Sequence, residues 1–448
     1  MAFYMNESVR GSESSPSAEG KPMQKCGTMR RMVNDFAATL GDAHVREMFL
    51  NCFFSSLDTA AEWKSDGSVF MLTGDIPAMW LRDSAVQVTG YLPYAAADDD
   101  VRALIRGVLA RQFFYINIDP YANAFNEEAN GRGHKDDVTD FDSPWVWERK
   151  FEIDSLCYPL WLAQQYAEQT GDYTVYDATF QAAYGRILDT FETEQDHFGR
   201  SSYRHSRPKY PQFPTLQNEG RGTPVGYTGM IWSGYRPSDD VCEYGYLIPS
   251  NMFACTVLEW LLGHAEKTGI SEEACLRTRK LCREIEQGIA QYAVYEHPKY
   301  GKMYAYEVDG LGNRLLCDDA NVPNLLGLPY IGYCAKNDPI YRNTRAFVLS
   351  GDDPYFFSGA AARGLGSPHT PDRYIWHIGI IMQLLTSACA EERAECFRYL
   401  LTTDAGCGCM HEGFDCDDPA KFTRPWFCWA NTLFARAVTE MKERGEIQ

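Results

Sequence analysis

Four segments of the sequence combine carboxylates with tryptophan, arginine or histidine. They are 73–84 (TGDIPAMWLRDS), 145–155 (WVWERKFEIDS), 232–240 (WSGYRPSDD) and 409–415 (CMHEGFD). An indole offers a flat apolar face to a sugar ring, and charged side chains bind its hydroxyl groups. Hydrolysis of a glycosidic bond needs one protonated carboxyl for the leaving oxygen and one carboxylate acting on the opposite face. The four segments therefore indicate glycoside hydrolysis.

Each segment also has a structural explanation. In the first, Arg82 and Asp83 could form a structural ion pair beside a core Trp80. The acids of the second suit a helix N-terminus, which accounts for Asp154 but not for the two tryptophans. The Pro-Ser-Asp-Asp string of the third is also typical of a turn whose aspartate caps a helix. The residues by themselves leave these alternatives open.

The fourth segment lies in a stretch that could suggest a metal site. Cys407, Cys409, His411 and Cys416 are close in sequence, but their spacing does not match paired Cys-x2-Cys knuckles, and the second half of such a site is missing. A histidine next to a glutamate can instead orient that carboxylate. We therefore expect no metal and no cofactor. The sequence also lacks a nucleophile elbow, a dinucleotide fingerprint and a phosphate-binding loop.

Composition narrows the function further. The 448 residues are 45% hydrophobic and 14% aromatic, which is ample for a sizeable core, and the net charge is −19. Such an acidic chain is unsuited to binding nucleic acid or an anionic membrane, and it suits a neutral substrate. The cysteine count of 15 is odd and scattered, so we interpret the cysteines as buried thiols in a reducing compartment. Without a signal peptide or an apolar stretch of membrane-spanning length, the sequence predicts a cytoplasmic protein.

The periodicity of the sequence is helical. Residues 1–25 are rich in Ser, Glu, Gly and Pro and are expected to be a disordered tail, and 26–448 are expected to form one domain. Helical segments are predicted near 28–62, 84–92, 101–113, 158–169, 180–191, 258–262, 271–289, 339–349, 372–389, 391–402 and 425–444. Long polar and aromatic loops separate them, and such loops are usually functional. Paired helices with functional loops predict an all-α fold, an (α/α)6 barrel.

Seven segments of the chain together resemble glycoside hydrolase family 125, the exo-acting α-1,6-mannosidases. They occur in family order and are 73–84, 147–159, 236–240, 318–323, 366–370, 374–379 and 411–412. Their joint match, from about residue 28 to 440, is far more specific than any one of them. The resemblance implies an (α/α)6 barrel that inverts anomeric configuration and needs no metal.

The resemblance also implies roles for individual residues. The general acid is assigned to Asp239, with Asp240 as the alternative, and the general base to Glu412. The acid must stay protonated near neutral pH, and we expect repulsion by Asp240 and an apolar setting beside Trp232 to raise the pKa of Asp239. The candidates for contacting the sugar are Trp80, Arg82, Asp83, Glu152, Asp154, Arg236, Asp240, Asn321, His369 and His411.

The sequence thus predicts an inverting exo-α-1,6-mannosidase that removes terminal mannose from N-glycan or mannan oligosaccharides. Its partner is a mannose-containing oligosaccharide, with no nucleic acid and no membrane. One alternative is a sugar 2-epimerase, which shares the toroid and uses paired histidines, such as His369 and His377, to move protons. Another is a carbohydrate-binding toroid without catalytic activity; the presence of both Asp239 and Glu412 disfavours it.

Overall fold

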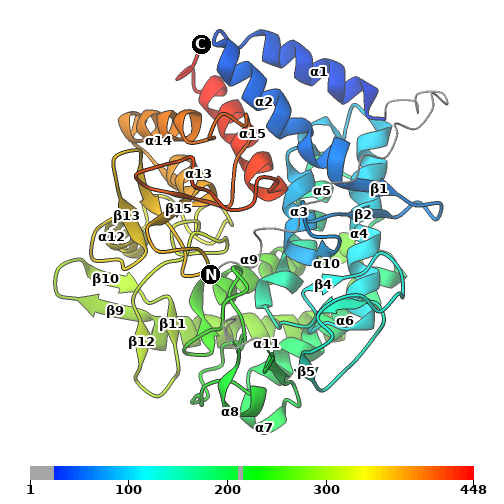
Figure 1. The fold of residues 1–448 in the computed structure, drawn as a ribbon. Coiled ribbons are helices and arrows are strands. Elements are labelled where there is room, and N and C mark those ends of the chain that lie inside the picture. Colours follow the sequence, from blue (N-terminus) through cyan, green and yellow to red (C-terminus); the bar gives the residue numbers. More distant parts are fainter. Residues whose placement is uncertain (1–24, 210–214) are drawn as a thin grey trace.

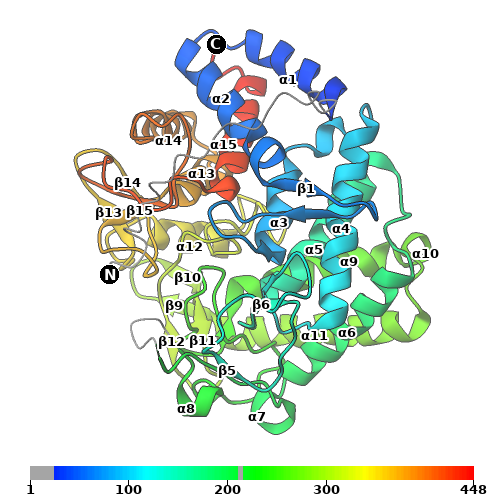
Figure 2. The ribbon, with the colours of Figure 1, turned by 45° about the vertical axis from the view of Figure 1, so that its right-hand side comes forward.

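The computed structural model describes residues 25–209 and 215–448, so the expected tail 1–25 lies almost entirely outside it. The described chain forms two concentric rings of helices (Figures 1 and 2). The inner ring contains α3 (Leu81–Thr89), α5 (Ile153–Thr170), α9 (Ile248–Gly263), α13 (His377–Thr386) and α15 (Cys428–Glu443). All residues of α3 and α13 are buried, because a helix inside a double ring is covered on every side.

The outer ring covers the inner helices from outside. It contains α2 (Ala43–Ser55), α4 (Asp99–Ile118), α6 (Ala178–Glu194), α11 (Glu272–Gly288), α12 (Pro339–Val348) and α14 (Ala390–Thr402). In this ring α2 packs on α15, α4 on α5, α11 on α9, and α14 on α13. Helix α11 shows the expected amphipathic pattern, because Leu281, Cys282 and Ile285 face the interior and its remaining surface is largely polar.

The space between α9 and α13 is filled by irregular chain rather than by a sixth regular inner helix. Tyr158 of α5 donates a hydrogen bond to the Val322 carbonyl (2.7 Å), which fixes one end of this chain. Asp318 accepts the backbone N–H groups of Leu325 (2.9 Å) and Leu326 (2.8 Å), so a side chain provides the acceptors that a helix would supply. Burial raises the pKa of Asp318 to about 8.

Short strands lead into four of the inner helices. They are β3 (Met79–Trp80) before α3, β6 (Val146–Glu148) before α5, β8 (Tyr246–Leu247) before α9 and β15 (Tyr374–Trp376) before α13. β3 pairs with β4 (Ala124–Phe125), which pairs with β6, and β15 pairs with β16 (Gly413–Asp415). This pairing gathers the N-terminal ends of several inner helices on one face of the double ring.

The remaining elements lie around this frame. The other antiparallel pairs are β1 (Ala61–Trp63) with β2 (Val69–Met71), β5 (Val138–Thr139) with β7 (His205–Ser206), β9 (Val294–His297) with β10 (Gly301–Tyr304), β11 (Glu307–Val308) with β12 (Arg314–Leu315), and β13 (Phe356–Ser358) with β14 (Arg363–Leu365). The other helical pieces are α1 (Gly27–Ala38), α7 (His197–Arg200), α8 (Gln217–Gly220), α10 (Ala265–Thr268), the 3-10 turn η2 (Leu92–Tyr94) and the π turns η1 (Ser56–Ala60) and η3 (Ile289–Ala293).

The predicted helices exist, but three boundaries were wrong. The segment 28–62 contains two helices, because the chain turns at Gly41 and Asp42 caps α2 by accepting the His44 N–H (2.8 Å). The helix placed near 258–262 begins ten residues earlier, at Ile248. The helix placed at 372–389 begins at His377, because 374–376 form β15.

One contiguous apolar core extends through the described chain from Cys26 to Met441. The C-terminal residue lies beside the first helices, where the Gly41 N–H donates to the Gln448 carbonyl (2.8 Å), and α15 packs along α2 in both views (Figures 1 and 2). Within 25–209 and 215–448, no helix is long and apolar enough to cross a membrane.

Candidate active site

A pocket lies on the face where the inner helices begin. Aromatic rings and carboxylates form much of its wall, as expected of a site that holds a polyhydroxylated ring. The lining residues are Thr73, Ile76, Trp80, Arg82, Asp83, Pro237, Asp239, Asn321, Trp376, Glu412, Arg424, Phe427 and Trp429. Both proposed catalytic carboxylates, Asp239 and Glu412, are therefore brought to one pocket from distant parts of the sequence.

The adjacent aspartates of the third segment point in different directions. Asp239 adopts a left-handed backbone conformation (φ 67°), and its side chain is 24% exposed and faces the pocket. Asp240 is more buried, and its carboxylate lies near the Ser238 hydroxyl (3.4 Å) and the His369 Nδ1 (3.4 Å). Asp240 is not part of the pocket wall. The geometry thus favours Asp239 over Asp240 as the acid.

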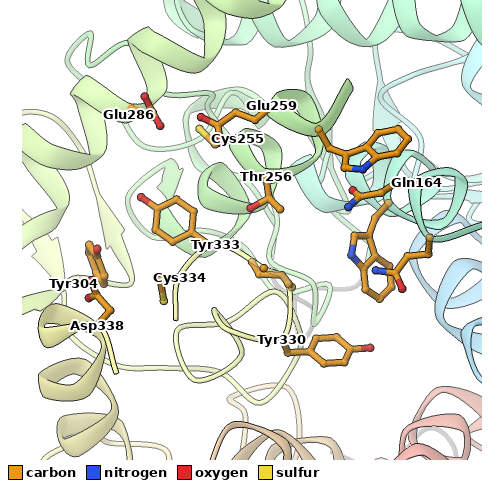
Figure 3. A pocket seen from close by; sticks show the side chains of 15 residues that line it. Gln164, Cys255, Thr256, Glu259, Glu286, Tyr304, Tyr330, Tyr333, Cys334 and Asp338 are labelled. Carbon is orange, nitrogen blue, oxygen red and sulfur yellow. The ribbon is translucent and has the colours of Figure 1, made fainter. Parts of the chain in front are cut away.

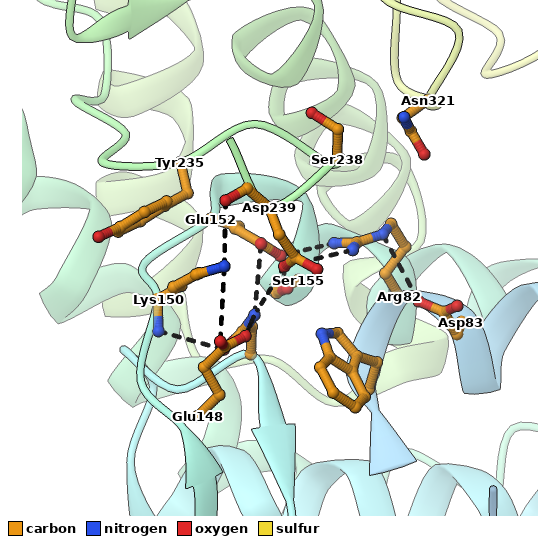
Figure 4. Close-up of polar contacts among 12 residues, drawn as sticks. Arg82, Asp83, Glu148, Lys150, Glu152, Ser155, Tyr235, Ser238, Asp239 and Asn321 are labelled. Atoms are coloured by element: carbon orange, nitrogen blue, oxygen red, sulfur yellow. Dashed lines mark hydrogen bonds and ion pairs between the residues drawn. The ribbon is translucent and has the colours of Figure 1, made fainter. Parts of the chain in front are cut away.

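Cations and an amide surround Asp239 (Figure 4). The Asn123 amide donates to the Asp239 carboxylate (3.1 Å), the Arg82 guanidinium lies 3.9 Å from it, and the Lys150 ammonium donates to the Asp239 carbonyl (3.1 Å). Burial favours the neutral acid, but Lys150, Arg82 and a hydrogen bond from Glu152 together lower the pKa of Asp239. The expectation that the pKa of Asp239 is raised by Asp240 and Trp232 was wrong, because the interactions with Lys150, Arg82 and Glu152 outweigh the effects of burial and Glu148.

Arg82 is held by three buried carboxylates, of which Asp83 is in the pocket wall. Its guanidinium contacts Glu152 (2.5 Å), Asp154 (3.3 Å) and Asp83 (3.6 Å), and its side chain is only 3% exposed. Burial raises the pKa of Asp154 to about 6 and that of Glu152 well above its usual value. Glu152 and Asp154 are not part of the pocket wall, and the structure places them behind Arg82.

Glu412 is held beside a cation that the sequence analysis missed. Glu412 precedes β16 and is 7% exposed, and its Oε1 lies 3.7 Å from the Arg424 guanidinium. Arg424 also donates to the Asp75 carboxylate (2.6 and 2.9 Å) and to the Thr73 carbonyl (2.7 Å). Arg424 therefore connects the loop before α3 to the proposed base.

Two other predicted sugar-binding residues lie outside the pocket wall. The buried Arg236 pairs with Glu307 of β11 (2.6 Å), and this pair fixes the loop that carries Asp239. His411 is also buried, stacks on Phe422 with ring centres 3.8 Å apart, and has one nitrogen 3.1 Å from the Asp404 carbonyl. Burial lowers the pKa of His411. Both side chains support the loops of the site.

Asn321 and His369 lie near the site in different ways. Asn321 is in the pocket wall, and its backbone N–H (3.0 Å) and side-chain amide (2.9 Å) both donate to Asp319. His369 is 37% exposed and lies beside Asp240, outside the wall. Although burial opposes it, the charge of Asp240 raises the pKa of His369 to about 9. His369 is therefore cationic at neutral pH and unsuited to act as a base there.

His377 occupies a different environment from His369. It is fully buried, its Nδ1 accepts the His411 N–H (2.9 Å), and its Nε2 lies 3.0 Å from the Thr403 hydroxyl. Burial lowers the pKa of His377 to about 3. Among the described residues, the pocket wall contains no histidine, which weighs against the epimerase alternative.

The cysteine-rich stretch does not gather as a metal site. Among the described residues, the single group with ligand-like spacing is Asp415, Cys416 and Asp417, which does not include Cys407, Cys409 or His411. Asp417 is already paired with Arg373 (2.6 Å). All fifteen cysteines, from Cys26 to Cys428, are free thiols, and most of them are buried, as expected.

A second cavity, of about 680 Å³, lies elsewhere in the ring (Figure 3). Trp161 and Gln164 from the middle of α5 and Cys255 and Glu259 from the middle of α9 contribute to its wall, together with Tyr333. It shares no lining residue with the pocket that contains Asp239 and Glu412. The presence of Asp239 and Glu412, and not cavity size, therefore distinguishes the candidate active site.

Residues 42–439 match the model of a family described as metal-independent alpha-mannosidase (GH125). The chain belongs to glycoside hydrolase family 125. A metal-independent alpha mannosidase from Streptococcus pneumoniae, solved as a non-productive complex with alpha-1,6-mannobiose, is 43% identical to this family 125 chain. That similarity covers 94% of this chain and 99% of the other, with a TM-score of 0.91. The resemblance seen in the sequence and the (α/α)6 fold are thereby confirmed.

A further relative and a structure of similar fold were also found. The meiotically up-regulated gene 157 protein of Schizosaccharomyces pombe is 36% identical over 453 residues, covering 95% of this chain and 88% of that protein. The glucoamylase from Saccharomycopsis fibuligera is 9% identical, with a TM-score of 0.53 over 93% of this chain and 96% of that one. This second likeness concerns the fold alone. The family membership supports an α-mannosidase.

About half of the pocket wall was predicted from the sequence. The predicted residues are Trp80, Arg82, Asp83, Asn321 and the two proposed catalytic carboxylates, whereas several aromatic residues were not predicted. The missed aromatic residues are Trp376, Phe427 and Trp429. Trp376 lies directly before α13, Phe427 directly before α15, and Trp80 directly before α3. An aromatic residue at the start of an inner helix is therefore the signal that could have found them.

Proposed function

We propose that this family 125 enzyme is an inverting exo-α-1,6-mannosidase that removes terminal mannose from N-glycan or mannan oligosaccharides. The observation that carries the proposal is the meeting of Asp239 and Glu412 in one aromatic-lined pocket. The Streptococcus pneumoniae relative was captured with alpha-1,6-mannobiose, which supports the linkage. The net charge of −19 also suits a neutral oligosaccharide.

The two carboxyl groups divide the reaction between them. Asp239 protonates the glycosidic oxygen as the bond from the anomeric carbon to that oxygen breaks. Glu412 accepts a proton from a water molecule, whose oxygen attacks the anomeric carbon from the opposite face. After the proton has left Asp239, Arg82 and the Asn123 amide are placed to stabilise its carboxylate. The positive charge of Lys150, which donates to the Asp239 backbone carbonyl, adds to this stabilisation.

A linkage panel tests the proposed activity. We expect the purified protein to release mannose from α-1,6-mannobiose, with no loss of rate in EDTA, because the matching family is described as metal-independent. The panel contains the α-1,2, α-1,3, α-1,4 and α-1,6 disaccharides, and product is measured by anion-exchange chromatography. Activity on the α-1,2 or α-1,3 disaccharide alone, or loss in EDTA restored by calcium or zinc, would contradict the proposal.

The same samples test the alternatives. An epimerase would convert free mannose to another hexose without consuming the disaccharide, and a binding toroid would leave both unchanged. The Glu412→Gln variant is the matched control, because it keeps the size of the side chain and removes the proposed base.

A further inference from the structure

The proposed general acid is in an environment that favours its ionised form. Lys150 and Arg82 approach Asp239 from two sides, and the Asn123 amide donates to its carboxylate. A general acid must carry a proton when substrate binds. The proton therefore has to be kept close to Asp239 on another group.

Glu152 is a neighbouring carboxyl that can hold this proton. The Asn123 Nδ2 lies 3.1 Å from the Asp239 carboxyl, 3.1 Å from the Glu148 carboxyl and 3.3 Å from the Glu152 carboxyl, so one nitrogen connects all three groups. Although burial opposes it, the charges of Lys150 and Arg207 hold the pKa of Glu148 well below its usual value, so Glu148 stores no proton and Glu152 is the neighbour that can. The Arg82 guanidinium also lies close to both carboxyl groups, at 2.5 Å from Glu152 and 3.9 Å from Asp239. In Figure 4 the Glu152 and Asp239 side chains overlap, and both reach toward the Arg82 guanidinium.

The surrounding charges favour the proton on Glu152. Glu152 is only 1% exposed, and the negative charges of Asp239 and Asp154 oppose its ionisation, while Arg82 (2.5 Å) favours it. Asp239 faces Lys150 and Arg82 as cations and Glu148 and Glu152 as acids. Two more titratable groups act on Asp239: the acidic side chain of Asp83 and the basic side chain of His369. Burial and repulsion raise the pKa of Glu152 well above its usual value.

We propose that Glu152 is a positioning residue that stores the proton which Asp239 delivers to the leaving oxygen. This inference rests on the proposed function of Asp239. The Glu152 hydroxyl passes its proton to the Asp239 carboxylate, and Asp239 passes a proton to the glycosidic oxygen as the bond to the anomeric carbon breaks. Arg82 and the Ser155 hydroxyl (2.8 Å) then stabilise the Glu152 carboxylate. Glu412 releases the proton taken from water to solvent, and Glu152 regains one, so the cycle balances.

The Glu152→Gln variant tests the proposal through its pH profile. Glutamine keeps the size and a hydrogen bond to Asp239 but stores no proton. We expect the alkaline limb of kcat/KM on α-1,6-mannobiose to move to lower pH, because Asp239 alone ionises more readily. For each pH unit by which the alkaline limb moves, the protonated fraction of the acid at a fixed pH on that limb falls roughly tenfold. On 2,4-dinitrophenyl α-mannoside, whose leaving group needs no proton, we expect a loss of less than about threefold.

Two further variants separate proton storage from a structural role. Asp154→Asn is the matched control, because Asp154 also pairs with the buried Arg82 (3.3 Å). It should lower the rate on both substrates without moving the alkaline limb. Glu152→Asp retains a titratable group and should move the limb back toward that of the unmodified enzyme. A Glu152→Gln profile with an unmoved limb, or an equal loss on both substrates, would overturn the inference.

The design also separates this inference from the proposed function. If Asp239→Asn loses disaccharide activity and keeps activity on the dinitrophenyl substrate, Asp239 is the acid. An unmoved alkaline limb in Glu152→Gln would then refute proton storage by Glu152 and leave the proposed function intact. If Asp239→Asn loses both substrates equally, the assignment of the acid fails as well.

Discussion

At the scale of single residues, the site depends on which carboxylates face the pocket. We expect Asp239→Asn and Glu412→Gln each to lower turnover of α-1,6-mannobiose by roughly 10²–10⁴-fold, because each removes a general acid or base. Asp240→Asn should cost less, because Asp240 is directed toward Ser238 and His369 and away from the pocket. Steady-state rates measure the effect, and unchanged melting temperatures show that the folds are intact. A larger loss of turnover in Asp240→Asn than in Asp239→Asn would assign the general acid to Asp240 instead.

The residue types were a good guide to the chemistry of the site, but they did not predict where each side chain points. Carboxylates beside Trp and Arg indicated a sugar site, and six of the predicted residues do line the pocket. The direction of Asp239 depends on its left-handed backbone (φ 67°), a conformation that is uncommon for a non-glycine residue and has no sequence signal here. Glu152 and Asp154 were predicted to touch sugar, but the charge of Arg82 draws them behind the wall.

At the scale of elements, the loop before α3 must pass close to the chain before α15. Gly74 has φ +75°, and a Cβ there would lie 2.4 Å from the Trp426 carbonyl oxygen. We expect Gly74→Ala to destabilise the protein by more than about 1 kcal/mol and to lower kcat/KM, because Thr73 and Asp75 in this loop bind Arg424 beside Glu412. Thermal unfolding and mannobiose kinetics measure the two effects.

A second glycine provides the control for that variant. Gly67 has φ +83°, but a Cβ there would have no neighbour within 4 Å. Gly67→Ala therefore carries the backbone cost alone, about 1 kcal/mol, and should leave kcat/KM unchanged. Equal losses of stability and activity in the two variants would contradict the proposed contact between the loops.

The elements themselves were largely predictable, and the junctions between them were not. The helical period located the amphipathic outer helices well, because one polar face and one apolar face produce a clear pattern. The inner helices α9 and α13 are apolar around most of their circumference, so α9 was placed ten residues too late and β15 was included in a helix. Strand pairs of two or three residues, such as β3 with β4, are too short to give a periodic signal.

At the scale of the whole molecule, one buried histidine makes stability depend on pH. The pKa of His377 is about 3 in the folded protein, and its usual unfolded value is about 6.5. The unfolded chain therefore binds a proton at a higher pH than the folded one, so stability is lost as pH falls from 6.5 toward 3. We expect this group alone to lower the free energy of unfolding by about 2 kcal/mol between pH 7 and pH 5.

The variant His377→Gln isolates this contribution. Chemical unfolding of the variant and of the unmodified protein at pH 7 and pH 5 gives the change in the free energy of unfolding with pH for each. The difference between these two changes isolates His377, because the contributions of titratable groups present in both proteins cancel. Asp318 is one such group, and its raised pKa, about 8, acts in the opposite direction by stabilising the fold as pH falls. A variant whose stability changes with pH as much as that of the unmodified protein would show that His377 does not titrate as described.

The architecture of the whole molecule places the two carboxylates where single displacement is possible. Asp239 and Glu412 come from loops at the face where the inner helices begin, and both line one pocket. The other carboxylates near Asp239 are held by cations or amides, as Glu152 is by Arg82 and Glu148 by Arg207 (2.7 Å), so none is free to act as a nucleophile. Water activated by Glu412 would then attack opposite the bond that Asp239 protonates.

This arrangement predicts the configuration of the first product. An α-linked mannoside should release β-mannose, and a proton NMR time course can record the anomeric signal before mutarotation equilibrates it. Glu412→Gln is the matched control and should show neither anomer above background. Early α-mannose, or a covalent mannosyl group on either Asp239 or Glu412, would indicate double displacement through a glycosyl-enzyme. In that case the second carboxylate would be a nucleophile, and its separation from the acid would be expected near 5 Å instead of roughly 6.5–9.5 Å.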